Sequence, residues 1–296
     1  MKAGTILAVN QSNLIQLSAS DMDTVCSQIA AFGFTAVRFA VNWAQTVNWF
    51  GPPTYTKVEA AAAALAKYNL TPLPVLGINK PWLSDGSVAT FGKYVTTCVS
   101  IFGGIPAYEV WNEPNLYNFS VGTPKTFLAY LRAAAVPIRA AGSKVIHGGL
   151  AAYPNAHPWF FFTNYSPDTW LTALFAAGEN NDYDLMGYHP YALSQGGNWT
   201  NPIGSYGMSE IAKLDAVRAT HGDTRPYVFT EIGYDTARVS AAATELPAQL
   251  AALPAGDVYF FCWRDTVGDG GSFGVVNSKN VPKLPYYNVV SGLLAG

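Results

Sequence analysis

The sequence has few charged residues. Only 12% of its 296 residues are Asp, Glu, Lys or Arg, against about 25% in average soluble proteins. The 17 basic and 19 acidic residues nearly cancel, to a net charge of −2, and no basic run occurs. Because nucleic acids are bound through clustered Lys and Arg, the composition argues against a nucleic-acid partner. A neutral, aromatic-rich surface suits neutral, hydroxylated ligands better.

Cysteine and histidine are also scarce. The three cysteines, Cys26, Cys98 and Cys262, lie far apart in the chain, a spacing that predicts buried free thiols rather than a disulfide framework or a metal-binding pair. The four histidines never occur as His-x-His or His-x-x-x-His. We therefore expect no metal centre and no organic cofactor.

Long apolar runs are missing as well. The uncharged stretch from Val145 to Pro167 is interrupted by prolines and asparagines, whereas a membrane span needs about 20 predominantly apolar residues. The first residues, MKAGTILAVNQ, predict a strand rather than a signal peptide. No membrane span is expected.

Strand-length apolar runs alternate with helix-length amphipathic runs along the whole chain. The predicted strands begin near Thr5, Thr35, Thr71, Ala107, Lys144, Asp184, Pro226 and Asp257. The predicted helices cover Asp21–Phe32, Tyr55–Tyr68, Val88–Phe102, Thr123–Ala141, Pro167–Ala177, Met208–Thr220, Ala241–Leu253 and Tyr286–Leu294. Pro137, inside the fourth helix, predicts a kink or a break.

Eight strand–helix units fill residues 1–296 without a linker. Strands that are apolar nearly throughout are covered on both faces, as in parallel sheets, and eight such units predict a single-domain (β/α)8 barrel. The alternative, a doubly wound open sheet, would carry a glycine-rich phosphate loop after the first strand, where this chain has Asn10-Gln11-Ser12-Asn13. In a barrel, active sites lie at the C-terminal ends of the strands.

Two of the seven glutamates lie at such strand ends. Glu113 follows the fourth strand in VWNEPN, and Glu231 ends the seventh in FTEIG. Two carboxyl groups in different environments can divide into an acid and an anion, which is what cleavage of a glycosidic bond requires. The alternative is that each glutamate caps a helix or pairs with an arginine.

The segment YEVWNEPNL, residues 108–116, resembles the Asn-Glu-Pro motif of clan A retaining glycoside hydrolases, which are (β/α)8 barrels. It looks closest to glycoside hydrolase family 39 and its single-barrel, exopolysaccharide-cleaving relatives. The resemblance implies a retaining hydrolase of β-linked poly- or oligosaccharides, with Glu113 as general acid/base and Glu231 as nucleophile. It further implies that Asn112 binds the sugar 2-hydroxyl.

Four further residues match the resemblance less specifically. His189 and Tyr191, after the sixth strand, resemble side chains that orient the nucleophile and line the cleft. Arg38 resembles an arginine placed near the nucleophile, and Trp263 resembles the tryptophan floor of the cleft. The accessory β domains usual in family 39 xylosidases and iduronidases do not fit into this chain, which favours the single-barrel relatives.

The remaining predictions concern Glu109 and the loop aromatics. Glu109 shares side-chain parity with Trp111 and Glu113 and is predicted to pair with Arg38 inside the barrel. Five loop tryptophans are candidates for stacking on sugar rings, and Trp43 is placed among the substrate-binding residues; the others are Trp49, Trp82, Trp159 and Trp199. Trp170 is predicted to lie in a helix core. The aromatic loops at 42–54, 151–166 and 192–206 favour endo action.

Three other functions stay open at this point. The same residues would serve a transglycosylase, and a carbohydrate-binding barrel could keep the cleft without turnover. An enzyme for a phosphorylated substrate is a third, since the segment 268–272 is glycine-rich, although it contains the acidic Asp269. Low charge and a polysaccharide substrate suggest action outside the cytoplasm, or in a phage product. The sequence predicts no particular oligomeric state.

Overall fold

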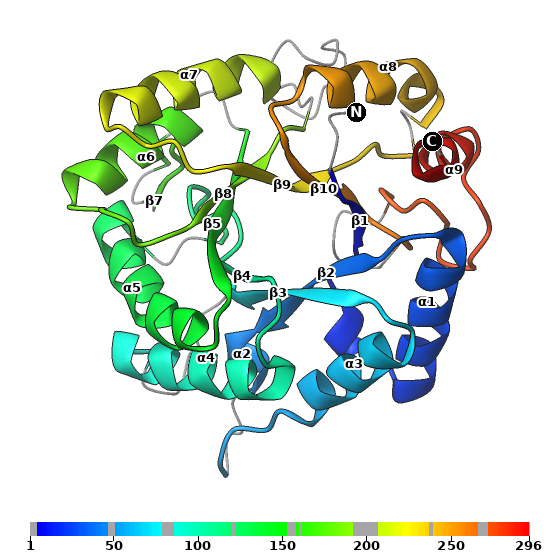
Figure 1. The fold of residues 1–296 in the computed structure, drawn as a ribbon, viewed down its shortest axis with the longest axis horizontal. Helices are drawn as coiled ribbons and strands as arrows, with labels where there is room; N and C mark the ends of the chain where they lie inside the picture. The colour runs from blue at the N-terminus through cyan, green and yellow to red at the C-terminus, as the bar shows by residue number, and fades with distance from the viewer. Residues whose placement is uncertain are drawn as a thin grey trace.

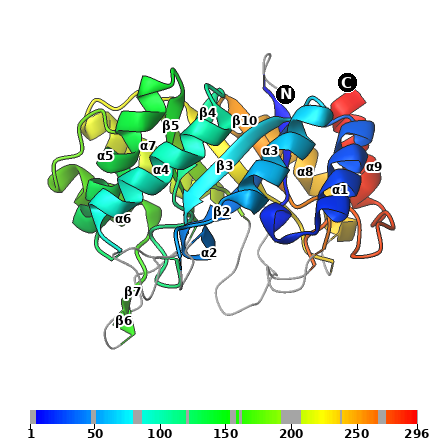
Figure 2. The same ribbon diagram turned by 90° about the horizontal axis from the view of Figure 1, so that it is seen from below.

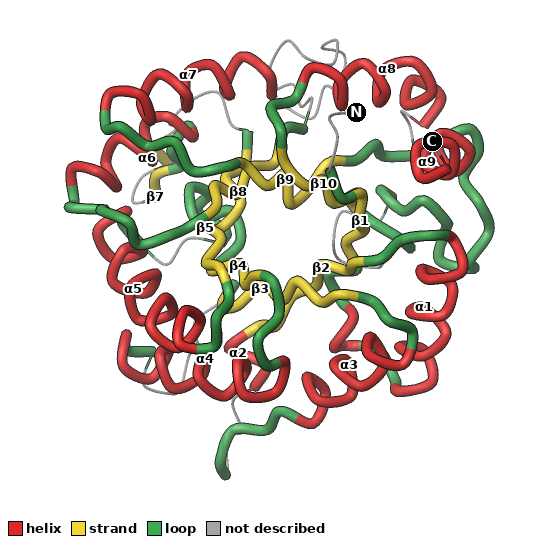
Figure 3. The backbone as a smooth tube through the Cα atoms, in the orientation of Figure 1, coloured by secondary structure: helices red, strands yellow, loops and turns green. Residues whose placement is uncertain are grey.

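The computed structural model describes residues 5–46, 51–78, 86–119, 122–152, 158–159, 162–191, 207–236, 239–265 and 272–295. Eight parallel strands close into a barrel in the order β1-β10-β9-β8-β5-β4-β3-β2, with the helices in a ring outside them (Figure 1). Figure 3 shows the strands as one continuous inner ring. The predicted (β/α)8 fold is confirmed.

The barrel strands are β1 (Leu7–Asn10), β2 (Ala36–Asn42), β3 (Thr71–Gly77), β4 (Ala107–Val110), β5 (Lys144–Ala151), β8 (Leu185–His189), β9 (Tyr227–Ile232) and β10 (Gly256–Phe261). A short antiparallel pair, β6 (Pro158–Trp159) and β7 (Phe162–Thr163), follows β5. Our strand predictions missed this pair. Figure 2 shows it projecting past the helices, at the end of the barrel where α2 lies.

The helices are α1 (Ala19–Phe32), α2 (Trp43–Thr46), α3 (Thr56–Lys67), α4 (Val88–Phe102), α5 (Pro124–Ala140), α6 (Pro167–Ala176), α7 (Gly207–Thr220), α8 (Val239–Ala252) and α9 (Tyr286–Ala295), with a 3-10 turn η1 (Leu14–Gln16). Ser18 caps α1 by accepting from the backbone N–H of Asp21, and Gly33 ends the helix with a left-handed φ of 110°. Helix α5 runs through Pro137 without a break. Within the described residues, no helix has the length and apolarity needed to cross a membrane.

The interior of the barrel is built in two layers. The lower layer is apolar and consists of Ala8, Ala36, Leu73, Ile146, Val228 and Tyr259. Side chains two residues apart on a strand point to the same side. Two residues beyond Ala8, Ala36 and Val228 stand Asn10, Arg38 and Thr230, all fully or nearly fully buried. A polar layer therefore lies directly on the apolar one, toward the C-terminal ends of the strands.

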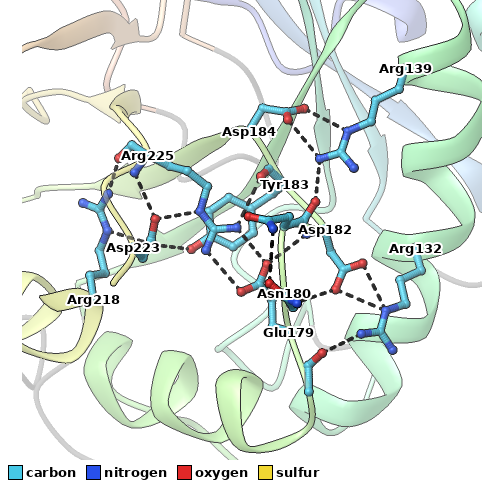
Figure 4. Close-up of polar contacts among 12 residues, drawn as sticks. Arg132, Arg139, Glu179, Asn180, Asp182, Tyr183, Asp184, Arg218, Asp223 and Arg225 are labelled. Atoms are coloured by element: carbon cyan, nitrogen blue, oxygen red, sulfur yellow. Dashed lines mark hydrogen bonds and ion pairs between the residues drawn. The ribbon is translucent and has the colours of Figure 1, made fainter. Parts of the chain in front are cut away.

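An ion-pair network joins elements at the opposite, N-terminal end of the barrel (Figure 4). Asp223 accepts from Arg218 at 3.0 Å, from Arg225 at 2.6 Å and from the hydroxyl of Tyr183 at 2.8 Å. Arg225 also pairs with Glu179 at 2.8 Å. Asp223 thus connects the end of α7 with the segments that lead into β8 and β9.

Asp223→Asn is expected to lower the free energy of unfolding at pH 7 by about 3 kcal/mol, because it leaves two guanidinium groups without their shared carboxylate. Although burial alone would raise the pKa of Asp223, hydrogen bonds from Arg225, Arg218 and Tyr183 hold it below its ordinary 3.8. This stabilisation is present above pH 3.8 and is lost as the pH falls below it. Urea unfolding at pH 7 and pH 3 should therefore show the difference between wild type and variant narrowing in acid.

The matched control is Asp182→Asn, which removes a carboxylate from a more exposed pair with Arg132. Asp182→Asn should lower the free energy of unfolding by less than about 1 kcal/mol. Equal urea midpoints for Asp223→Asn and wild type at pH 7 would contradict the role given to Asp223.

Candidate active site

The loop after β4 leaves the strand direction at Trp111. Trp111 and Glu113 have left-handed φ values of 73° and 42°. The indole of Trp111 therefore points out of the barrel, toward Phe91 and Tyr130 in the helix layer. A Cβ on Gly77 would lie 2.3 Å from this indole, so the turn requires glycine at 77. We predicted that the side chains of residues 109, 111 and 113 point to the same side. The alternation ends with the strand, so Trp111 points the other way.

The motif Asn112-Glu113-Pro114-Asn115 is held by hydrogen bonds at three residues, through the side chains of Asn112 and Asn115 and the backbone of Glu113. Asn112 accepts from Arg38 at 2.7 Å. The backbone N–H of Glu113 donates to the carbonyl of Gly149 on β5 at 3.0 Å. Asn115 is fully buried and bonds both backbone groups of Ala151 that face it, each at 3.0 Å. Together these bonds hold Glu113 at the C-terminal mouth of the barrel.

Arg38 and Glu109 form a buried ion pair in the polar layer. The Arg38 Nε lies 2.6 Å from Glu109 Oε2, and its second nitrogen lies 3.0 Å from Oε1. This confirms the predicted pairing. The same guanidinium donates to Glu231 Oε1 at 2.6 Å, so one cation contacts two carboxylates.

A bulge in β9 explains how adjacent residues Thr230 and Glu231 both reach this layer. Phe229 pairs with Val258, but Ile232 pairs with Phe260, so β9 holds one residue more than β10 between these pairs. A bulge re-aims a side chain that would otherwise point to the outer face. Thr230 and Glu231 can therefore both face the barrel interior.

Glu231 is surrounded by donors. Besides Arg38, the hydroxyl of Tyr191 donates to Glu231 Oε2 at 2.9 Å, and the side-chain amide of Asn10 lies 3.5 Å from Oε1. Glu113 is bonded to His189 instead: its Oε1 lies 2.9 Å from Nδ1 of His189, and that nitrogen is 3.7 Å from Glu231 Oε2. The two glutamates thus occupy different environments.

These environments shift the two pKa values apart. Burial raises the pKa of Glu113, and the bond to His189 offsets this only in part, so the pKa lies above its ordinary 4.5. Burial also acts on Glu231, but His189 when it is protonated, the charge of Arg38 and the bond from Tyr191 outweigh it and put the pKa below 4.5. The pair therefore offers one protonated and one ionised carboxyl group.

The separation of the two carboxyl groups is short. Single ligand-type atoms of Glu113, His189 and Glu231 all lie within 4.8 Å of one another. Carboxyl groups about 5–5.5 Å apart are typical of retaining glycosidases, and wider gaps are typical of inverting ones. The same three groups are the candidate metal cluster in the described part of the chain. However, both ring nitrogens of His189 are already engaged, and Arg38 would repel a cation, so we assign no metal here.

Trp43 and Trp263 lie elsewhere than predicted. Trp43 begins α2, is 2% exposed and packs against Phe91 and Tyr94. Trp263 lies at a bend after β10, is 4% exposed, and its ring is 5.3 Å from that of Phe32 on α1. Both rings belong to the hydrophobic core between barrel and helices, so neither presents an open face to a sugar.

Other predicted residues can be placed only in part. Trp170 is fully buried in α6, as expected, and all three cysteines are buried free thiols. Trp49, Trp82 and Trp199 lie outside the described residues, as do the segment 266–271 and the whole loop 192–206. The side chain of Trp159 in β6 is likewise not described.

Four residues near the two glutamates or near Tyr191 were not predicted: Asn10, Thr230, Phe261 and Phe273. Asn10 and Thr230 belong to the buried polar layer, and a polar residue inside an apolar strand was the signal that could have identified them. Phe261 ends β10, is partly exposed, and contacts Tyr191 and Phe273 at ring distances of 6.4 and 5.8 Å. An aromatic surface thus adjoins Glu231 through Tyr191, two residues before the tryptophan that we had assigned to this role.

The barrel is similar to several solved structures. An exo-β-1,4-mannosidase from an Opitutaceae bacterium is 18% identical, with a TM-score of 0.69 over 98% of this chain and 59% of that chain. A GH5_18 protein from Bifidobacterium longum, in complex with Manβ1-4GlcNAc, is 13% identical, with a TM-score of 0.73 over 98% and 78%. An endo-1,4-β-mannanase from Rhizomucor miehei is 14% identical, with a TM-score of 0.67 over 98% and 95%.

At these identities the comparisons show a shared fold. They agree with the (β/α)8 architecture implied by the clan A resemblance and do not single out family 39. This chain spans 59% of the length of the bacterial exo-mannosidase. No protein-family model matches the sequence, and no curated protein matches it.

Arg38→Met is expected to lower the free energy of unfolding by about 3–5 kcal/mol, because Glu109 would stay buried without its cation. Guanidinium chloride unfolding at pH 7 measures this. The control is Arg38→Met combined with Glu109→Leu, which removes both charges and should recover much of the loss. A single variant as stable as wild type would show that the ion pair does not hold the polar layer together.

Proposed function

We propose that this chain is a retaining glycoside hydrolase that cleaves β-linked bonds in a poly- or oligosaccharide by double displacement. The observation that carries the proposal is the meeting of Glu113 and Glu231 at the C-terminal mouth of the barrel. Their closest oxygens lie within 4.8 Å of each other, and their pKa values are shifted in opposite directions. The shared fold with mannosidases and mannanases supports it.

In the first step, Glu231 attacks the anomeric carbon as a carboxylate. Its low pKa keeps it ionised, and Arg38 and Tyr191 hold both oxygens in place. Glu113, protonated because its pKa is high, donates its proton to the departing oxygen. A glycosyl ester forms on Glu231, and the aglycone leaves as an alcohol.

In the second step, Glu113 acts as a base. The negative charge of Glu231 is one cause of the raised pKa of Glu113. Once Glu231 is esterified that charge is gone, so the pKa of Glu113 falls and the group is left as a carboxylate. It then takes a proton from the water that attacks the anomeric carbon, and the ester bond to Glu231 breaks.

The neighbouring residues bind the sugar or orient the two glutamates. Asn112 is partly exposed and has its amide oxygen bonded to Arg38, which leaves its NH2 group as the donor for the 2-hydroxyl. His189 contacts Glu113 and Tyr191 contacts Glu231. Phe261, beside Tyr191, offers an aromatic face to a sugar ring.

The substrate class is proposed from two sources. The structurally similar proteins include an exo-β-1,4-mannosidase, a GH5_18 protein holding Manβ1-4GlcNAc and an endo-1,4-β-mannanase, so β-1,4-linked mannosides are the first substrates to test. The likeness of residues 108–116 to family 39 extends the panel to bacterial exopolysaccharides. Oligosaccharide products of mixed length would support endo action.

Glu231→Ala is expected to lower turnover of an activated aryl β-glycoside by about 10⁴-fold or more, since no group remains to form the ester. Azide should enter the space left by the carboxylate and restore turnover, giving an α-glycosyl azide. Chromatography and NMR of the product check this. Glu59→Ala, an exposed position on α3, is the control and should behave as wild type. Full activity of Glu231→Ala would refute the assignment.

Glu113→Gln is expected to lose about 10³-fold in kcat/KM with poor leaving groups, which need a proton, and much less with activated aryl groups.

In wild type, kcat/KM should fall below about pH 4.5 as Glu231 takes up a proton, and should fall again at higher pH as Glu113 loses its proton. The variant should lack the fall at higher pH. Equal losses for good and poor leaving groups would argue against Glu113 as the acid.

A further inference from the structure

We propose that Thr230 and Glu109 are positioning residues that keep Nε2 of His189 protonated, so that Nδ1 of His189 and the carboxyl group of Glu113 share the single proton used in catalysis. This inference rests on the proposed function and adds a hydrogen-bonded chain behind the acid/base. The hydrogen-bonded chain runs from Glu109 through Thr230 and His189 to Glu113. Its first three residues are fully buried, and Glu113 is partly exposed.

Glu109 fixes the direction of the first bond. Each group within hydrogen-bond distance of its carboxylate is a donor: two nitrogens of Arg38 at 2.6 and 3.0 Å, the backbone N–H of Gly149 at 2.8 Å, and the Thr230 hydroxyl at 3.2 Å. Hydrogen bonds to an ionised acceptor are the stronger kind. The hydroxyl hydrogen of Thr230 is therefore directed to Glu109.

Thr230 then fixes the tautomer of His189. A hydroxyl has one hydrogen and two lone pairs, and the hydrogen is already used on Glu109. Nε2 of His189 lies 3.0 Å from the same oxygen, so this bond exists only if Nε2 carries the hydrogen. In neutral histidine, Nδ1 is then a lone pair.

The consequence appears at Glu113. Nδ1 of His189 lies 2.9 Å from Glu113 Oε1, and with Nε2 protonated this bond contains a single proton. The proton resides on Glu113, donated to Nδ1, or on Nδ1, donated to the carboxylate. In the other tautomer, neutral His189 would donate from Nδ1 to Glu113, which favours the ionised carboxylate and lowers the pKa of the acid.

The backbone packs closely against the hydrogen-bonded chain at Gly149. A Cβ on Gly149 would lie 2.1 Å from Nε2 of His189 and 2.5 Å from the Thr230 hydroxyl. Pairing between β5 and β8 shifts by one residue at this point, since His147 pairs with Met186 but Leu150 with Tyr188. The extra residue in β5 and the bulge in β9 bring Gly149 and Thr230 to the same place.

The titration of Glu113 depends on several surrounding groups. The ionisable and charged groups that face Glu113 and His189 come from the barrel strands and the segments after them: Arg38, Glu109, Tyr191 and Glu231. None of them contacts Nε2 of His189 except through Thr230. Removing the Thr230 hydroxyl therefore changes the tautomer of His189 without removing a charge.

The test compares Thr230→Val, which keeps the shape but lacks the hydroxyl, with Thr230→Ser, which keeps the hydroxyl. Protein labelled with ¹⁵N-histidine reports the tautomer directly by NMR, with His189 assigned from a His189→Asn sample. Wild type and Thr230→Ser should show Nε2 protonated at pH 7, and Thr230→Val should move the proton to Nδ1. The fall of kcat/KM at high pH should move to lower pH by about one unit or more in Thr230→Val, and should not move in Thr230→Ser. A shift of this size corresponds to the free energy of one hydrogen bond to a charged group.

Activity should also distinguish Thr230→Val from Thr230→Ser. With poor leaving groups, Thr230→Val should lose about 10- to 100-fold in kcat/KM, with a smaller loss for activated aryl groups, and Thr230→Ser should restore both. A uniform loss with unchanged histidine signals and an unchanged pH limb would overturn the proposal and leave Thr230 a packing role. Because the NMR experiment needs no turnover, an inactive wild type would count against the proposed function alone, and the histidine spectra would still decide the role of Thr230.

Discussion

The arrangement of this site depends on a single buried cation. Arg38 stands in the polar layer of the barrel and contacts Glu109, Glu231 and Asn112 at 2.6 to 3.0 Å. Two carboxylates can remain ionised in an interior only if a positive charge lies between them. Arg38 supplies that charge, with its own side chain supported from below by the apolar layer. The three residues that contact it, from β4, the loop after β4 and β9, are thereby fixed relative to one another.

Arg38 also separates the roles of the two glutamates. It touches Glu231 and leaves Glu113 to His189, so one carboxyl group is surrounded by donors and the other faces a ring nitrogen with which it can share a proton. The difference does not come from burial, which acts on both groups in the same direction. It comes from which partners the strand ends bring to each carboxyl group. An acid and an anion therefore stand within 4.8 Å of each other.

Much of this could be predicted from the sequence, because barrel geometry maps strand ends onto one face. The eight strands, the meeting of Glu113 with Glu231 and the pairing of Arg38 with Glu109 follow from apolar periodicity and strand position. The predictions failed where the backbone departs from regular alternation. Trp111 leaves the strand with a positive φ, the bulge in β9 turns Glu231 inward beside Thr230, and Trp263 lies at a bend. Neither a bulge nor a left-handed residue other than glycine has a clear signal in a single sequence.

These departures coincide with the site for a physical reason. A regular strand of period two directs every second side chain inward, which fills a barrel but cannot place two adjacent residues on one ligand. The bulge in β9 places Thr230 and Glu231 together, the shift in β5 brings Gly149 under His189, and the turn after β4 aims Glu113 back over the barrel mouth. The regular layers below supply the packing that holds such irregular backbone in one conformation. The exact placement of the side chains at the mouth of the barrel therefore depends on the regularly packed layers beneath them.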